Sequence, residues 1–375
     1  MELTPFELDR WLAHKYSVSP KVEYDLASST GPRWTLAELL RLSSDSESKR
    51  DNLLQTALSY CAGEGGNSLR QAIADYQHVS LDDIQVTTGA SEALMILFAI
   101  AAQPDGNVII PSPNFPSTEE LPRLFGLETR FYYLRPENKF RIDVEEIKKL
   151  ADDRTQIILV NSPHNPTGSV LSFEDMTQLH DFCAERNIRF VVDEVYHPVY
   201  HAQEMPSAAT LPKATVIGSL SKSFCLSGLR TGWIVERDRN RVEKYFDARA
   251  YFTISSAALS EAMAILALGH REKIFEQVKR VAAANLKHLV SFFDAHAEVL
   301  SWVRPPGGLT IFPWLNSRSD ARVFCQQALK HGVLIVPGDC FGMPSHFRLG
   351  YGTLREQNFK KALERLSDAV KAEWQ

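Results

Sequence analysis

The sequence predicts an α/β protein in which a large domain, built on a mostly parallel mixed sheet, is joined to a smaller α+β domain. The chain has 375 residues, enough for about two domains of ordinary size. From residue 84 to 217, short apolar strands alternate with helical segments, as in a parallel sheet covered by helices on both faces. After about residue 255, long helices precede short strands instead. We therefore expect an N-terminal arm joining the small domain at 1–45, the large domain at 46–255 and the C-terminal small domain at 256–375.

The elements follow in order along the chain. Short helices are expected before residue 60, with two apolar clusters, Phe6, Leu8, Trp11 and Leu12, and then Leu36, Leu39, Leu40 and Leu42. A turn at 28–32 separates these clusters, and a helix is predicted at 67–78. Strands are predicted at 84–88, 107–111, 129–134, 156–160, 189–192 and 214–217, with helices at 91–102, 118–125, 144–151 and 173–186. The strands show little period-two alternation, which indicates a sheet buried on both faces.

The C-terminal part has a different texture. Helices are predicted over 256–296 and at 320–331, and strands at 302–303, 309–314, 333–336 and 347–349. A final amphipathic helix carries Phe359, Leu363, Leu366 and Val370 at helical spacing. These elements predict a separate α+β unit.

Composition excludes several classes of protein. The net charge of −5 and the pI near 6.1 give no indication of nucleic-acid or anionic-membrane binding. Five scattered cysteines without a Cys-x-x-Cys pair argue against a disulfide framework and against a metal site. The early acidic residues do not fit a secretory signal, and no apolar stretch is long enough to span a membrane. We therefore expect a cytoplasmic protein.

Lys222 follows the last predicted strand of the large domain, in Ser219-Leu-Ser-Lys222, among small and apolar residues. Burial at a strand end disfavours the ammonium form of a lysine and leaves a nucleophilic amine. Such lysines form Schiff bases with carbonyl groups, including the aldehyde of pyridoxal phosphate. An exposed loop lysine is the commoner situation for a single residue, so the residues after the other strands must decide.

Ligands of open parallel sheets bind at the carboxyl ends of the strands. Gly89, Ala90 and Ser91 follow the strand at 84–88 and open a helix, so they predict a phosphate cradle, although an ordinary serine N-cap also fits. Phe115 follows the next strand and either stacks on a planar ring or packs in the core.

Two further strand ends carry polar groups. Asn165 lies in the loop Asn161-Ser-Pro-His-Asn-Pro-Thr-Gly168, whose prolines would hold its amide toward a phenolate oxygen; a rigid turn is the alternative. Asp193 and Tyr196 follow the strand at 189–192. A carboxylate at this position suits a pyridinium nitrogen, and Tyr196 suits the same phenolate oxygen as Asn165. A salt-bridged structural aspartate is the alternative for Asp193.

Four more residues suit anions. Ser219, Ser221 and Arg230 fit a phosphate dianion, because arginine binds two oxygens at once. Arg348, in a strand pattern, suits a substrate α-carboxylate, and a domain-bridging ion pair is its alternative. Together these strand ends place an aldehyde partner, a ring platform, an acid for a pyridine nitrogen and a phosphate site along one sheet edge.

With these motifs the chain resembles the class I and II aminotransferases, the pyridoxal-phosphate enzymes of fold type I. The most specific parts are His164-Asn-Pro-Thr-Gly168, Asp193-x-x-Tyr196 and Ser219-x-Ser-Lys-x-x-x-Leu-x-Gly-x-Arg230, within a match from about residue 60 to 348. The resemblance implies transfer of the amino group of an L-amino acid to a 2-oxo acid. Lys222 would form the aldimine and shuttle the proton, with Asp193 on the pyridine nitrogen and Tyr196 on the ring oxygen.

The resemblance also implies roles for the other residues. Besides Lys222, Asp193 and Tyr196, the cofactor would contact Gly89, Ala90, Ser91, Phe115, Asn165, Ser219, Ser221 and Arg230. Arg348 would bind the substrate carboxylate with Asn165 and the backbone of Gly31. Tyr60 looks like the tyrosine that reaches the phosphate of the neighbouring subunit, which implies a homodimer with shared active sites.

Some positions depart from the family pattern. Phe115 stands where Tyr or Trp is frequent, and Glu261 stands where Gln is frequent. The stretch 26–31 loosely resembles the capreomycidine-synthase branch, which implies a lyase, replacement or cyclisation reaction as the alternative function. Arg33 and Trp34 near the predicted pocket mouth would favour an acidic or aromatic substrate, and a purely solvent-facing Arg33 is equally compatible.

Three rival functions fit the sequence less well. Ser219-x-x-Lys222 fits a serine acyltransferase, but that motif should open a long helix and needs a distant Lys-Thr-Gly, which the chain lacks. Gly63-Glu-Gly-Gly66 does not complete a dinucleotide-binding motif. A DNA-binding regulator would need a longer N-terminal domain with a basic recognition helix.

Overall fold

The structure, a computed structural model, describes residues 4–17 and 21–374. Its largest element is a seven-stranded sheet with the strand order β2-β8-β7-β6-β5-β3-β4. The strands are β2 (Ile84–Thr87), β3 (Asn107–Ser112), β4 (Glu128–Tyr133), β5 (Thr155–Asn161), β6 (Arg189–Asp193), β7 (Ala214–Ser219) and β8 (Gly232–Val235). All neighbours are parallel except the two that β8 makes with β2 and β7. The predicted α/β class with a mostly parallel mixed sheet is confirmed.

The sequence pattern misses two elements of this layer, β8 and the helix α10 (Arg239–Phe252). β8 is a four-residue apolar run that follows directly on the Arg230 motif, without a turn signal to set it apart. In α10 only Tyr245 and Arg249 are buried, so its apolar periodicity is weak. The insertion of β8 between β2 and β7 therefore could not be predicted from local pattern.

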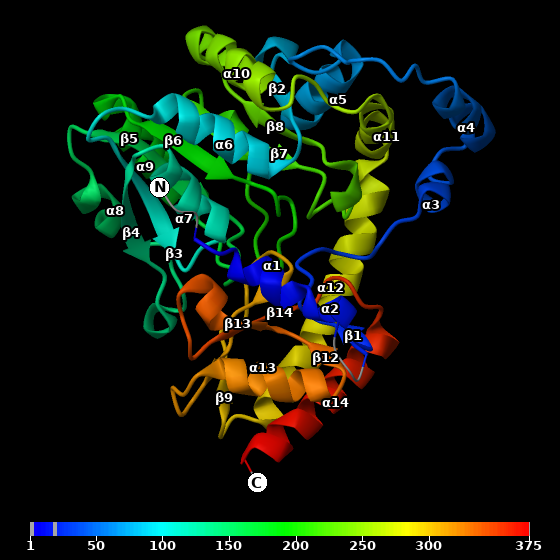
Figure 1. Cartoon of the computed structure of the whole chain (residues 1–375), viewed down its shortest axis with the longest axis vertical. Helices are drawn as coiled ribbons and strands as arrows, with labels where there is room; N and C mark the ends of the chain where they lie inside the picture. Colours follow the sequence, from blue (N-terminus) through cyan, green and yellow to red (C-terminus); the bar gives the residue numbers. More distant parts are fainter. Residues whose placement is uncertain (1–3, 18–20, 375) are drawn as a thin grey trace.

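Helices cover both faces of the sheet (Figure 1). They are α5 (Asn67–Gln77), α6 (Ala90–Ala101), α7 (Pro116–Leu124), α8 (Val144–Leu150), α9 (Phe173–Arg186) and α10. Ile157 and Leu159 of β5 belong to a hydrophobic core with α6, whereas Ile158 and Val160 belong to a second core with α9. Successive strand residues point to opposite faces, so both faces are buried as predicted.

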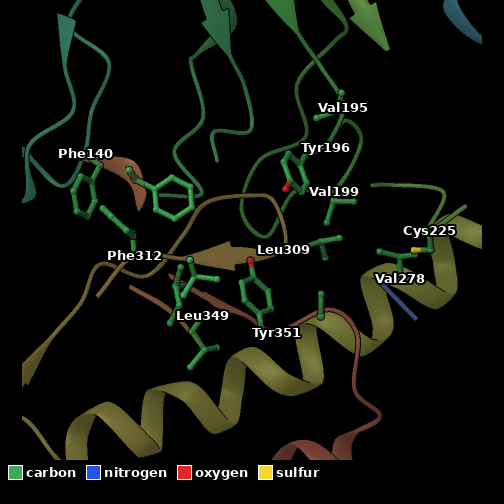
Figure 2. Packing of buried hydrophobic residues seen from close by; sticks show 14 of the residues in the cluster. Phe140, Val195, Tyr196, Val199, Cys225, Val278, Leu309, Phe312, Leu349 and Tyr351 are labelled. Carbon is green, nitrogen blue, oxygen red and sulfur yellow. The ribbon is translucent and has the colours of Figure 1, made fainter. Parts of the chain in front are cut away.

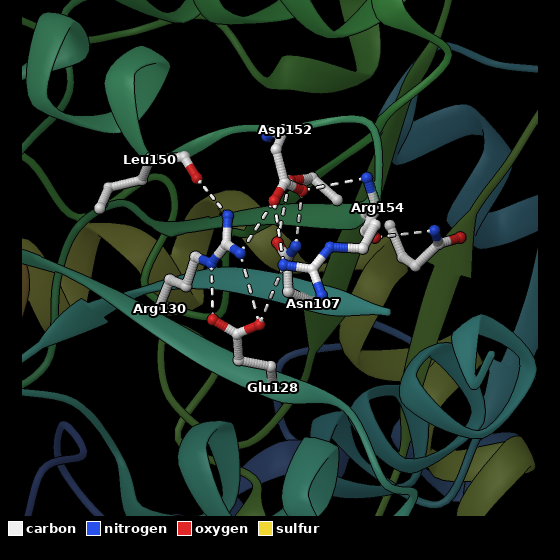
Figure 3. Close-up of polar contacts among 8 residues, drawn as sticks. Asn107, Glu128, Arg130, Leu150, Asp152 and Arg154 are labelled. Atoms are coloured by element: carbon white, nitrogen blue, oxygen red, sulfur yellow. Dashed lines mark hydrogen bonds and ion pairs between the residues drawn. The ribbon is translucent and has the colours of Figure 1, made fainter. Parts of the chain in front are cut away.

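A charged network closes the amino ends of β3, β4 and β5 (Figure 3). Arg130 donates to Glu128 at 2.8 Å and lies 2.9 Å from a carboxylate oxygen of Asp152. The side-chain amide of Asn107 also donates to Asp152 at 2.8 Å. Hydrogen bonds from Asn107 and Arg130 hold the pKa of Asp152 well below its usual range. The charged groups at the amino ends of these strands pair with one another. A ligand is expected at the opposite edge, where the carboxyl ends of the strands lie.

The C-terminal part begins with α11 (Ala258–Gly269) beside α5 and continues below the large sheet from α12 (Arg271–Ala295) onward (Figure 1). Its other helices are α13 (Ala321–Lys330) and α14 (Glu356–Trp374). Its strands are β9 (Leu300–Ser301), β10 (Thr310–Ile311), β11 (Trp314–Leu315), β12 (Val333–Leu334), β13 (Val336–Pro337) and β14 (Phe347–Gly350). The predicted face of α14 is buried.

Three strand predictions in this part were wrong in detail. The segment 333–336 forms two short strands, β12 and β13, which pair in different sheets. The segment 309–314 forms two short strands, β10 and β11, because Pro313 between them has no N–H for a ladder. The strand predicted at 302–303 lies two residues earlier, as β9.

The N-terminal arm lies against the C-terminal part. Its elements are α1 (Glu7–Leu12), α2 (His14–Ser17), β1 (Tyr24–Asp25), α3 (Leu36–Leu40) and α4 (Ser46–Leu54). β1 pairs in parallel with β12, and the indole N–H of Trp11 donates to the carbonyl of Ile335 at 2.7 Å. The boundaries 1–45, 46–255 and 256–375 stay a prediction.

The two parts share a hydrophobic core. Figure 2 shows Tyr196 and Val199, which follow β6, close to Leu309 and Tyr351 from the C-terminal part. All four side chains are at least nine-tenths buried. Within 4–17 and 21–374 no helix combines the length and the apolar content needed to cross a membrane.

Candidate active site

Lys222 lies just beyond the carboxyl end of β7, at the wall of a cavity of about 580 Å³. Its amine donates a hydrogen bond of 2.8 Å to the hydroxyl of Ser29, which comes from the N-terminal arm. Burial lowers the pKa of Lys222 to about 8; the positive charge of Arg348 acts in the same direction, and Asp193 opposes it. This environment shifts the balance toward the free amine, compared with a lysine in water.

Asp193 ends β6 at the same edge of the sheet. Its Oδ1 accepts the backbone N–H of Val195 at 3.1 Å. Burial raises the pKa of Asp193 to about 6, although the N–H of Val195 and the charge of Lys222 lower it. Among the described residues this carboxylate has no salt-bridge partner, so the alternative of a salt-bridged structural aspartate is wrong.

Two residues of this cluster, Ser29 and Asn161, are absent from the sequence prediction. Asn161 ends β5 and binds two loops at once: its amide donates to the carbonyl of Asp193 at 3.0 Å, and its Oδ1 accepts the backbone N–H of Asn165 at 2.7 Å. Its place as the last residue of a buried strand was the signal available in the sequence. For Ser29 no local signal exists, because its contact with Lys222 spans 193 residues.

Arg348, on β14, is brought against Asn165 and the N-terminal arm. It is 2% exposed, and it donates to Oδ1 of Asn165 at 3.1 Å and to the carbonyl of Ala27 at 2.9 Å. Its Nε has no partner within the described residues, and its guanidinium lies 5.0 Å from the ring centre of Phe341. No carboxylate of the described part pairs with it, so the alternative of a domain-bridging ion pair is wrong.

Tyr196 is fully buried, and its hydroxyl has no hydrogen-bond partner in the described part of the chain. Burial raises the pKa of this phenol, and the charge of Arg348 and the nearby hydroxyl of Ser29 partly oppose the shift. A buried hydroxyl without a partner costs free energy, so such groups mark positions where a ligand supplies the missing hydrogen bond.

Gly89, Ala90 and Ser91, the residues of the predicted phosphate cradle, lie at the start of α6. Gly89 has φ +79°, and a Cβ at this position would lie 2.6 Å from a guanidinium nitrogen of Arg230, which is a collision. No side chain caps α6, whose N-cap is Gly89, so the interpretation of Ser91 as an ordinary N-cap is wrong. The hydroxyl of Ser219 accepts the N–H of Ser221 at 2.9 Å. An arginine and a helix N-terminus with free N–H groups thus converge on one point.

The other predicted residues are placed as follows. Phe115 is half-buried at the start of α7, with its ring centre 5.8 Å from that of Phe6 in an edge-on arrangement. Gly31 is buried, and a Cβ there would collide with the sulfur of Cys225, so only glycine lets the arm approach the Lys222 segment. The structure does not bring Tyr60 into this cluster, because its side chain is 82% exposed.

Two interpretations from the sequence change with these contacts. Glu261 is buried and its Oε2 accepts the N–H of Gly66 at 3.1 Å, so it ties the loop after Tyr60 to α11. The serine acyltransferase arrangement is absent: Ser219 ends a strand, and Lys222 hydrogen-bonds Ser29 instead of Ser219.

These observations fit pyridoxal phosphate. Among the described residues, the hydroxyl of Tyr196 has no hydrogen-bond partner and the half-buried carboxylate of Asp193 has no salt bridge, and the turn at Gly89 lies beside Arg230. Lys222 offers the amine that an aldehyde needs. The fold and this set of residues define a pyridoxal-phosphate-dependent enzyme of fold type I.

Comparison with known proteins identifies the family. The family model for "Aminotransferase class I and II" matches residues 28–366. Capreomycidine synthase from Streptomyces vinaceus is 29% identical over 97% of this chain and 93% of its own length. A probable aspartate/prephenate aminotransferase from Thermus aquaticus is 28% identical over 86% of this chain and 87% of its own. The crystal structure of a PLP-dependent aminotransferase from Streptococcus suis superposes with a TM-score of 0.92 at 28% identity, over 99% of both chains.

The chain therefore belongs to the class I and II aminotransferase family. Pyridoxal phosphate is its cofactor, and its reaction is transamination between an amino acid and a 2-oxo acid. The described residues contain no cluster of three or more side chains suited to a metal ion.

Proposed function

We propose that Lys222, Asp193 and Tyr196 carry the transamination and that Arg348 binds the carboxylate of the amino acid. The observation that carries this proposal is that Lys222 and Arg348, from distant segments, line one cavity, while the charges of Arg348 and Asp193 both act on the Lys222 amine. When bound, the cofactor supplies an aldehyde that accepts the amino group and a ring that withdraws electrons. The remaining steps belong to side chains of this chain.

Each side chain has a definite task in this proposal. Arg348 orients the substrate through two of its N–H donors that Asn165 and Ala27 leave unused, because a planar guanidinium matches a carboxylate. Nζ of Lys222, unprotonated above about pH 8, takes the α-proton of the oriented substrate. Asp193 keeps a proton on the ring nitrogen, and this cation in turn lowers the raised pKa of the buried carboxylate. Asn165 and Tyr196 donate to the ring oxygen.

The phosphate completes the proposed arrangement. Gly89, Ala90 and Ser91 present N–H groups and a hydroxyl, Ser219 and Ser221 add hydroxyls, and Arg230 adds a guanidinium. Phe115 would stack on the ring face, and the backbone of Gly31 would line the substrate carboxylate. Proteins bind phosphate dianions at such helix N-termini without a metal.

The test uses the purified enzyme and the absorbance of its bound cofactor. L-amino acids added in pools should convert the aldehyde form to the pyridoxamine form, and a 2-oxo acid should restore it. Ammonia release without a stable pyridoxamine form would contradict transamination, and the absence of any cofactor band would contradict the site itself.

We also propose a homodimer in which Tyr60 reaches the phosphate of the neighbouring subunit. Large apolar side chains in its own segment and at the end of α10 are exposed, namely Leu58 at 83%, Tyr251 at 90% and Ile254 at 55%. Such exposure is typical of an interface with another chain. Sedimentation should give a dimer, and Tyr60→Phe should weaken cofactor binding without changing that mass. A monomer with full activity would contradict both parts.

A second candidate function is a lyase, replacement or cyclisation reaction. The specific observation in its favour is the similarity to capreomycidine synthase over nearly the whole chain. Both reactions would use Lys222 and Asp193, so only the released product would distinguish them. Mass spectrometry of the products distinguishes them: an oxo acid supports transamination, and a dehydrated or ring-closed product supports the alternative.

We further infer a reducing compartment such as the cytoplasm. The support is the state of the five cysteines, which are all free thiols. Native mass spectrometry of protein from its natural source should show no disulfide; a disulfide-bonded native form would contradict the inference.

A further inference from the structure

The cavity beside Lys222 has a charged wall that the proposed transamination chemistry does not use. Lys15 of α2, Asp25 of β1 and Arg33 of the following loop all line it. Arg348 lines the same cavity and is 2% exposed, whereas the side chain of Arg33 is 70% exposed. Arg348 therefore lies at the inner end of the cavity and Arg33 at its mouth.

Asp25 is fully engaged by neighbouring groups. Its Oδ2 accepts the ammonium of Lys15 at 2.6 Å and lies 3.6 Å from the guanidinium of Arg33. Its Oδ1 accepts the backbone N–H groups of Ala27 and Ser28 at 3.2 and 3.1 Å. Because both oxygens already have partners, Asp25 is not free to bind a cationic substrate group.

The two cations, in contrast, keep unused donors. Within the described residues Arg33 makes a single ion pair and no hydrogen bond, and Lys15 makes a single side-chain hydrogen bond. A guanidinium carries five N–H donors and an ammonium three. Two cations and one anion also leave the cluster with an excess positive charge, which a further anion would neutralise.

The spacing fits a short substrate. Ala27, whose carbonyl accepts from Arg348, is two residues from Asp25, which holds Lys15 and Arg33. In extended backbone two residues span about 7 Å. The cavity wall also contains apolar side chains, namely Leu12, Leu36, Leu39 and Met263. A substrate with an anion at each end and a short methylene spacer would match this arrangement.

We propose that Lys15 and Arg33 bind a distal anionic group on the side chain of the substrate and thereby select amino acids with an acidic side chain. The inference rests on the proposed transamination at Lys222 and adds the substrate class. Asp25 acts as the positioning residue: it holds the two cations beside each other through contacts that leave their other donors free.

The first experiment measures binding by calorimetry with the cofactor-loaded enzyme. The probes are glutarate and adipate, which carry no amino group, and their monoamides, in which one carboxylate is replaced by a neutral amide. Each diacid should bind about tenfold more tightly than its monoamide, because a hydrogen bond to a charged group contributes about 1.5 kcal/mol. Added salt should reduce this difference.

Variants assign the preference to the two cations. Arg33→Met and Lys15→Met should each lower the ratio of diacid to monoamide affinity. Arg41→Met is the matched control, because it removes an exposed arginine of the same arm that does not line the cavity. Arg33→Glu should reverse the preference toward probes with a distal amine, such as 6-aminohexanoate. This reversal is a gain of binding, which misfolding could not produce.

Three outcomes would overturn the inference: equal affinity for diacid and monoamide, preference of the unaltered enzyme for the distal amine, or an equal effect of Arg41→Met. The proposed function is tested apart from these, by the cofactor absorbance. An enzyme that binds the cofactor and converts neutral amino acids best would refute the acidic substrate class alone.

Discussion

The guanidinium of Arg348 donates a hydrogen bond to the side-chain oxygen of Asn165 at 3.1 Å, across 183 residues of sequence. One of these residues is assigned to the substrate carboxylate and the other to the ring oxygen of the cofactor. Their direct contact means that neither group can move alone. With the proposed roles, a substrate that engages Arg348 would act on the cofactor position through Asn165 and would so link substrate binding to the chemistry.

Replacement of Arg348 by Met tests this link. The variant loses two charged hydrogen bonds, so kcat/KM for amino acids should fall about a hundredfold or more. A primary amine without a carboxylate should lose much less activity, since Arg348 affects it only indirectly, through Asn165 and the pKa of Lys222. Arg348→Lys is the control: it keeps the charge but not the planar fork, and it should recover only part of the loss. Equal losses for amine and amino acid would mean that Arg348 has a structural role only.

Replacement of Lys222 by Ala removes the amine that the cofactor aldehyde requires. The visible absorbance band that borohydride bleaches should disappear, and transamination should fall by several orders of magnitude. Lys213→Ala is the matched control, because this lysine is exposed and lies near the amino end of β7. A variant at 222 that kept an unchanged spectrum would remove the basis of the assignment.

The lowered pKa of Lys222 makes a prediction about the rate at which cofactor-free enzyme takes up pyridoxal phosphate. Only the unprotonated amine attacks the aldehyde, so the rate should rise with pH up to about 8 and then level off. An unshifted lysine would give a rate that still climbs above about pH 10. Because Arg348 contributes to the lowering, Arg348→Met should move the midpoint upward. Stopped-flow absorbance across this pH range measures both.

The share of the structure that the sequence could predict differs between the fold and the candidate site. The strands that carry Asp193 and Lys222 were predicted, because buried parallel strands are continuous apolar runs that leave a strong pattern. The antiparallel β8 was missed, because it follows directly on the Arg230 motif without a turn signal to set it apart. Its position was decided by pairing with β2 and β7, which are distant in sequence.

The site divides in the same way. Strand-end residues such as Asn165 follow a rule about parallel sheets and could be named beforehand. The contact of Ser29 with Lys222, and that of Arg348 with Ala27, depend on how the N-terminal arm packs. Glu261 looked uninterpretable in the sequence because its partner, the N–H of Gly66, lies 195 residues away. Long-range packing, which leaves no local pattern, accounts for each of these gaps.

The unpartnered hydroxyl of Tyr196 leads to a prediction with opposite signs in the two forms of the enzyme. In the cofactor-free form Tyr196→Phe removes a buried hydroxyl that has no partner, so the variant should be more stable by about 1 kcal/mol, or roughly 2 °C in Tm. With the cofactor bound, the same change removes a hydrogen bond, so binding should weaken about tenfold. Calorimetric melting of the cofactor-free and cofactor-bound forms measures the change in stability and the change in cofactor binding.

Tyr245→Phe provides the matched comparison for Tyr196→Phe. Tyr245 is equally buried, but its hydroxyl donates to the carboxylate of Glu236 at 3.0 Å. Its loss should destabilise both forms by about 1.5–3 kcal/mol, since a hydrogen bond to a charged group is removed. If Tyr196→Phe instead destabilised the cofactor-free form, its hydroxyl would already have a partner there, and the argument that it awaits the ring oxygen would fail. A stabilised cofactor-free form with weaker cofactor binding is the one combination that the proposed role requires.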